Sequence, residues 1–163
     1  HARGVFKLRL ALDAAYPGII AAAVHSLEAT MPANSVNVSD RGSWVEVYCY
    51  SRSWPWLFPQ HGPGRKHERR IELAPWQRRL ATLHPRLLLR GLIHSDGCRF
   101  VNTGRGWSHP RYAFANSSDG VRSIFCSACE ALGVRWTWAA PNTIYVSRKA
   151  DVARLDEFIG PKR

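Results

Sequence analysis

The chain has 163 residues, of which 45% are hydrophobic, and this composition excludes an overall disordered polypeptide and supplies core material for two small α+β units. Its 23 Lys and Arg against 12 Asp and Glu give a net charge of +11, which favours a polyanionic partner, with a solubilising surface charge as the alternative. No run of 18 apolar residues and no signal-peptide core occurs, so we expect no membrane span, a cytoplasmic location and four reduced cysteines.

A strand and a helix are predicted at the start of the chain. Apolar residues alternate over 5–12, the period of a half-buried strand, which places Lys7 and Arg9 on one face. Asp13 is positioned to cap a helix over 17–31, where apolar residues recur every three or four positions. A hairpin follows, and its predicted strands are 35–39 and 44–51. In the second of these strands both alternating sets suit a core, so its buried face stays unassigned.

The same order of elements is predicted again in the second half. The expected elements are a strand over 111–116, a helix over 121–132, a hairpin with strands 134–138 and 143–147, and a final helix over 149–159. Setting Asp119 on Asp13 and Ser147 on Ser51 aligns the two halves, which indicates an internal repeat resting on element order. Before the second copy, helices are expected after Pro75 and over 85–95.

Residues 89–97 form the most specific motif, Leu-Arg-Gly-Leu-Ile-His-Ser-Asp-Gly. A glycine inside a helix costs about 1 kcal/mol relative to Ala, so Gly91, on the same face as Ser95, indicates the close approach of another backbone. Gly97 ends the helix and leaves Asp96 at its C-terminal end, where the helix dipole disfavours an anion. A divalent cation near Asp96 would remove that conflict.

This motif resembles the nine-residue signature of the LAGLIDADG homing endonucleases. The two agree at Leu89, Gly91, Leu92, Ile93, Asp96 and Gly97, and differ at Arg90, His94 and Ser95. The resemblance implies an α+β, duplicated LAGLIDADG homing-endonuclease-like fold, whose antiparallel sheets form a DNA-binding saddle with helices on the other face. It also implies that two motif helices pack together and that their final acids hold Mg²⁺ for phosphodiester hydrolysis.

The resemblance divides the chain into three parts. Residues 1–59 are the expected first repeat, 60–84 a basic Gly/Pro-rich linker with a connecting helix, and 85–163 the second repeat. The repeat alignment puts the first motif helix before His1, so the first repeat is expected to lack its opening helix. This chain would then supply only one of the two acids. A homodimer through 86–95, or a missing N-terminal part of the same protein, is the expected partner for the remaining motif helix.

The resemblance also assigns roles to individual residues. Asp96 is the expected metal ligand and catalytic acid. Arg99 either stabilises charge on the phosphate in the transition state or clamps a phosphate without catalytic effect. The residues expected to bind DNA from the strand faces are Lys7, Arg9, Arg99, Arg111 and Arg135. The expected helix-packing residues are Leu89, Gly91, Leu92, Ile93, Ser95 and Gly97.

Two functions follow from these expectations. The first is a site-specific, Mg²⁺-dependent endonuclease for double-stranded DNA, or a fragment of one. The second is a non-cleaving, DNA-binding transcriptional regulator built on the same fold. A Ser-His-Asp hydrolase is a distant third, because no nucleophile elbow occurs. Cys126 and Cys129 are one helical turn apart, but without a second cysteine pair they are more typical of core thiols than of a metal site.

Overall fold

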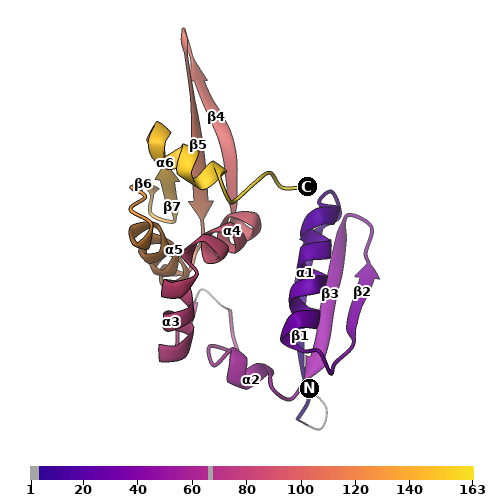
Figure 1. The fold of residues 1–163 in the computed structure, drawn as a ribbon. Helices are drawn as coiled ribbons and strands as arrows, with labels where there is room; N and C mark the ends of the chain where they lie inside the picture. Colours follow the sequence, from indigo (N-terminus) through magenta and orange to yellow (C-terminus); the bar gives the residue numbers. More distant parts are fainter. Residues whose placement is uncertain (1–3, 66–67) are drawn as a thin grey trace. The chain divides into compact units, whose positions relative to one another are not determined.

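The computed structural model describes residues 4–65 and 68–163, and in it the chain forms two compact units (Figure 1). Unit 1 ends at His61 and includes Lys162–Arg163, and unit 2 is Gly62–Pro161. Each unit has one antiparallel sheet, and the described residues contain six helices, so the predicted α+β class is confirmed. No helix in the described part of the chain is long and apolar enough to cross a membrane. Of the predicted linker, 66–67 lie outside the described residues.

Unit 1 is a three-stranded sheet with a helix packed on one face. Its elements are β1 (Phe6–Asp13), α1 (Pro17–Thr30), β2 (Val36–Asp40), β3 (Trp44–Ser51) and the one-turn helix α2 (Trp54–Leu57). The strand order is β1-β3-β2, and both pairings are antiparallel. Gly42, with φ of +83°, makes the turn between β2 and β3, where its amide donates to the Asp40 carboxylate. The predicted strand, helix and hairpin are confirmed.

The core of unit 1 decides which face of β3 is buried. Val47 and Cys49 are fully buried and pack with the residues of α1. Because side chains alternate along a strand, Glu46, Tyr48 and Tyr50 share the opposite face. No helix in the described part of unit 1 covers that face, and we call it the open face of unit 1.

The predicted cap at Asp13 is wrong. The residue before α1 is Tyr16, and it makes no side-chain cap. The Asp13 carboxylate instead accepts a hydrogen bond from the Ala15 amide at 2.9 Å, so it closes the turn after β1. Pro17 has no amide hydrogen to be capped, which lowers the need for a capping side chain.

Unit 2 is a four-stranded sheet covered on one face by helices. Its elements are α3 (Pro75–Leu83), α4 (Pro85–Asp96), β4 (Gly97–Gly104), β5 (Trp107–Ala115), α5 (Asp119–Ala131), β6 (Thr137–Ala140), β7 (Thr143–Val146) and α6 (Lys149–Asp156). The strand order is β4-β5-β7-β6. Phe114 of β5 stacks on Phe125 of α5 with ring centroids 4.4 Å apart, and Leu89 and Ile93 of α4 join the same core. The predicted helices are therefore present.

Three predicted boundaries in unit 2 are wrong. The strand expected over 111–116 begins at Trp107, because it pairs with β4, a strand for which the sequence patterns gave no bounds. The strand expected from Val134 begins at Thr137. Gly133, with φ of +65°, follows the end of α5, and the Val134 amide donates a hydrogen bond to the Cys129 carbonyl. Because this amide belongs to the helix C-terminal cap, Val134 does not pair in the sheet. The last helix ends at Asp156, three residues before its predicted end.

The two units repeat one order of elements. The run β5-α5-β6-β7-α6 in unit 2 has the same order as β1-α1-β2-β3-α2 in unit 1. In both sheets the last strand of the run lies between the other two, since β1-β3-β2 corresponds to β5-β7-β6. Unit 2 adds α3, α4 and β4 before this run. The agreement supports the internal repeat that element order predicted.

Candidate nucleic-acid interface

The motif helix α4 is anchored in unit 2 by one of its faces. Leu89 and Ile93 are buried in the core, and Leu92 is half-buried against it. Gly91 lies on the exposed side, and a Cβ added there would meet no atom beyond the helix's own backbone within 4 Å. The predicted close approach of another backbone at Gly91 is therefore not present among the described residues. Gly97 is the crowded glycine, since a Cβ there would lie 2.8 Å from the Ala113 carbonyl oxygen.

Asp96 is exposed at the C-terminal end of α4, as predicted. Its Oδ2 accepts hydrogen bonds from Asn116 Nδ2 at 3.1 Å and from Ser95 Oγ at 3.2 Å. These neutral donors offset the charge that the helix end disfavours. No group of three or more His, Cys, Asp or Glu side chains suited to a metal ion occurs in the described part of the chain. The described residues therefore offer Mg²⁺ one carboxylate here, and waters, DNA phosphates or acids from outside the described residues would have to supply its other ligands.

Arg99 is held by an ion pair on the helix-covered face of the sheet. Its guanidinium binds Asp156 of α6 through two hydrogen bonds, of 2.7 and 2.9 Å. The Tyr112 hydroxyl donates to the same carboxylate at 2.6 Å. Hydrogen bonding by Arg99 lowers the pKa of Asp156, and burial raises the pKa of Tyr112. We therefore assign Arg99 to holding α6 against the hairpin, and the structure does not bring it together with the other predicted DNA-binding residues.

Arg111 lies on the opposite face of the same sheet, which none of the described helices of unit 2 covers and which we call the open face of unit 2. It is opposite Phe100 in register, and its guanidinium carbon is 5.9 Å from the centroid of the Tyr145 ring. The rings of Phe100 and Tyr145 are 5.8 Å apart. A cation of β5 thus lies beside aromatic side chains from the two neighbouring strands, β4 and β7. Phe100 and Tyr145 were not among the predicted site residues.

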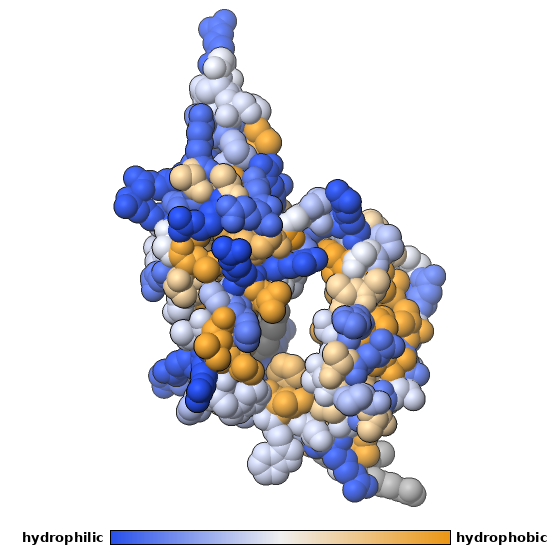
Figure 2. Space-filling view, in the orientation of Figure 1, coloured by the Kyte–Doolittle hydropathy of each residue, from blue (hydrophilic) through white to orange (hydrophobic). Residues whose placement is uncertain are grey.

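The β4–β5 hairpin extends beyond the rest of the sheet (Figure 1). The strand β7 pairs with β5 only over 112–115, so 100–104 and 107–111 continue as a two-stranded ribbon. Asn102 and His109 face each other on the open side of the ribbon, and His109 stacks on Trp107 with ring centroids 5.3 Å apart. Figure 2 shows the tip of this ribbon as hydrophilic and the part just below the tip as intermediate in hydropathy. These polar side chains were also missed by the sequence patterns.

Lys7 and Arg9 lie together on the open face of unit 1, as predicted. Lys7 is opposite Tyr50 and Arg9 is opposite Tyr48 in the antiparallel pairing of β1 with β3. The Lys7 ammonium is 3.9 Å from the centroid of the Tyr48 ring and 2.8 Å from a carboxylate oxygen of Glu46. Cations and aromatic rings therefore alternate across this face, as they do in unit 2.

Arg135 lies outside the sheet. It precedes β6, and its backbone amide donates to Asp151 of α6 at 3.3 Å, while the residue as a whole is exposed. The expectation that it reads DNA from a strand depended on a strand over 134–138, and that boundary is wrong. Its position therefore gives no support to base contact.

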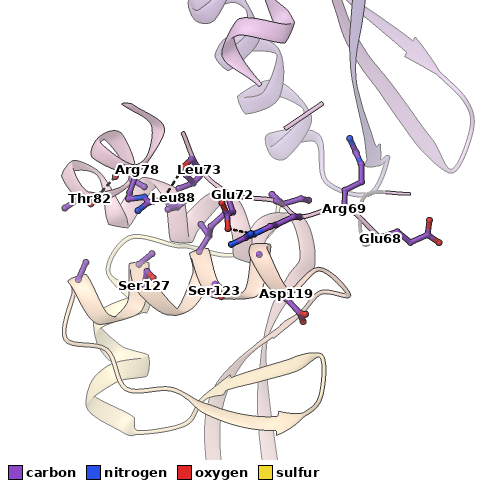
Figure 3. A pocket seen from close by; sticks show the side chains of 17 residues that line it. Glu68, Arg69, Glu72, Leu73, Arg78, Thr82, Leu88, Asp119, Ser123 and Ser127 are labelled. Carbon is purple, nitrogen blue, oxygen red and sulfur yellow. Dashed lines mark hydrogen bonds and ion pairs between the residues drawn. The ribbon is translucent and has the colours of Figure 1, made fainter. Parts of the chain in front are cut away.

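A separate cleft of about 720 Å³ lies among α3, α5 and the segment 68–73 of unit 2 (Figure 3). Ser123 and Ser127 of α5 lie along one wall of the cleft. The Ile71 carbonyl lies against Gly120 of the same helix, where an added Cβ would be 2.0 Å from the carbonyl oxygen. None of the residues predicted to act on DNA lines this cleft. The cleft is therefore distinct from the two open sheet faces.

Comparison of the sequence with protein-family models and with curated proteins finds no match. Function is therefore inferred from the two open faces and their residues.

Proposed function

We propose that this protein binds double-stranded DNA with the open faces of its two sheets, and that it is a degenerate relative of the two-repeat LAGLIDADG homing endonucleases. The observation that carries the proposal is the two-stranded ribbon of β4 and β5. The major groove of DNA admits a two-stranded β-ribbon, and the open side of this ribbon carries Asn102, His109 and Arg111. Asparagine pairs well with adenine and arginine with guanine, so these residues suit base edges.

The charge of the protein supports the same partner. A net charge of +11 on 163 residues attracts phosphates and gives binding that depends on counterion release. The open faces place Lys7 and Arg9 in one unit and Arg111 in the other beside aromatic rings. Basic side chains position a protein on the DNA backbone, and the polar ribbon residues then supply the sequence preference.

Binding without cleavage is the form of this function that the site favours. Asp96 has neutral hydrogen-bond partners, and the described residues do not complete a Mg²⁺ site around it. A regulator that retained the fold and lost hydrolysis matches this arrangement. Mg²⁺-dependent cleavage is the second candidate, favoured by the exposure of Asp96 at the end of the motif helix, and it requires acids from outside the described residues.

Fluorescence titration of a random-sequence 30-base-pair duplex at two salt concentrations tests the proposal. We expect binding that weakens steeply with salt, and Arg111→Ala should weaken it. Arg79→Ala is the matched control, because Arg79 is exposed on α3, away from the open face, and its loss removes the same charge. Equal effects of the two substitutions would refute the open face as the binding surface, and an absence of binding at low salt would refute DNA binding.

A further inference from the structure

Glu46 is a buried acid at the centre of the open face of unit 1. The residue is only 4% exposed, although it lies on the face that carries the cations. Its carboxylate oxygens lie 2.8 Å from Lys7 Nζ, 3.7 Å from Arg9 Nε and 3.4 Å from Arg41 Nη2. The three cations come from β1 and from the turn between β2 and β3, so a single carboxylate gathers side chains from two parts of the sheet.

An acid is an unexpected residue at this position. A buried carboxylate is unfavourable unless it is paired, and a surface that binds DNA gains nothing from negative charge. Tyr48 and Tyr50 on the same face of β3 demonstrate that uncharged side chains are accommodated there. The hydrogen bond from Lys7 is the main cause that lowers the pKa of Glu46, so the carboxyl stays ionised at neutral pH.

The carboxylate fixes the cations while leaving them accessible. The side chains of Lys7, Arg9 and Arg41 are 33%, 62% and 52% exposed, and the cluster of three cations and one acid keeps a net charge of +2. Long basic side chains lose conformational freedom when they bind, and anchoring them beforehand reduces that loss. Donors held in one position can be complementary to particular base edges, whereas mobile basic side chains bind any phosphate within reach.

We propose that Glu46 is a positioning residue for DNA specificity: it holds Lys7, Arg9 and Arg41 in one geometry for base edges and weakens the attraction of this face for unspecific phosphate. The inference rests on the proposed DNA binding. In this role Glu46 acts through its three basic partners. Removing the acid should therefore raise the affinity for random-sequence DNA and lower the discrimination between sequences.

The test compares two duplexes, one enriched from a random library by the wild-type chain and one of random sequence. For Glu46→Gln we expect tighter binding of the random duplex, a log–log salt slope steeper by about 0.9, and discrimination between the duplexes reduced about tenfold. Glu28→Gln is the matched control, since Glu28 is exposed on α1 in the same unit, and it should leave discrimination unchanged. Glu46→Asp keeps the charge but shortens the side chain, so it should lower discrimination without changing the salt slope.

Three results would overturn the inference while leaving DNA binding intact. Full discrimination in Glu46→Gln, or in Glu46→Asp if the first variant does not fold, would show that the acid does not position the cations. Equal weakening of both duplexes would show that it supports only the fold. If the wild-type chain enriches no sequence but binds random duplex, specificity itself is absent and the inference fails; if it binds neither, the proposed function fails as well.

Discussion

The two units build the same run of strands and helices but cover their sheets to different extents. In unit 2, Tyr112 and Phe114 of β5 are 1% and 0% exposed beneath the helices. The corresponding strand of unit 1, β1, has leucines at 8, 10 and 12 that stay partly exposed. The difference follows from α4, whose Leu89 and Ile93 fill the core of unit 2 and which has no counterpart among the described elements of unit 1. A shared topology thus does not imply shared stability.

The largest expected effect comes from opening the better-covered core. Leu89→Ala should lower the free energy of unfolding of unit 2 by about 3–4 kcal/mol, because Leu89 is fully buried and its loss leaves a cavity. Leu10→Ala, the matched substitution in unit 1, should cost about 1–2 kcal/mol, since this side chain already meets solvent. Urea unfolding of both variants measures the difference. Equal losses would contradict the unequal covering of the two sheets.

A smaller effect is expected where α6 is tied to the β4–β5 hairpin. Asp156→Asn should lower the free energy of unfolding by about 1 kcal/mol. The loss is this small because solvent screens the ion pair, since the side chains of Arg99 and Asp156 are 42% and 36% exposed. The pKa of Asp156 is lowered in the folded state, so its contribution is complete above the ordinary aspartate pKa of about 4 and is lost as the pH falls through the lower folded value.

The urea midpoint measured between pH 7 and pH 2 checks this dependence. The wild type should lose more stability than Asp156→Asn over the acid range. Glu157→Gln, an exposed neighbour on the same chain segment, serves as the control and should follow the wild type. Parallel curves for wild type and Asp156→Asn would show that the ion pair contributes nothing to stability.

The smallest expected effect concerns the exposed side of α4. Gly91→Ala should stabilise unit 2 by about 0.5–1 kcal/mol, because the added Cβ meets no atom within 4 Å and alanine favours the helix. Gly97→Ala should destabilise, because its Cβ would collide with Ile93 and with the Ala113 carbonyl. Sedimentation should accompany the melting curves. If a second copy packs on Gly91, as the motif led us to propose, Gly91→Ala would lower both association and stability.

The sequence predicted the elements with one polar and one apolar side better than those without. In β1, Lys7 and Arg9 alternate with leucines, so both the strand and its faces could be predicted. In β4, Asn102 and Thr103 lie on different faces and both are polar, because a two-stranded ribbon is solvated on each side. Such a strand gives no periodic signal, and its polar residues could not be assigned to a site.

The position of Arg99 illustrates a second limit. Its distance along the chain from Asp96 is three residues, which suggested a shared site, but its partner Asp156 is 57 residues away. Pairing between distant segments depends on how α6 packs on the sheet, and local spacing does not contain that information. Glu46 was missed for a similar reason, since its burial among Lys7, Arg9 and Arg41 depends on the register of β1 with β3.

Hydrogen–deuterium exchange of the chain with and without a random-sequence 30-base-pair duplex tests most directly the central claim that the open sheet faces bind DNA. Amides in the ribbon of β4 and β5 report on it, because beyond Tyr112 this ribbon has no third strand to protect it. We predict slower exchange over 98–111 and in β1 on adding the duplex, with little change in α5. Protection confined to α3, α5 and the segment 68–73 would place the DNA at the cleft and contradict the account.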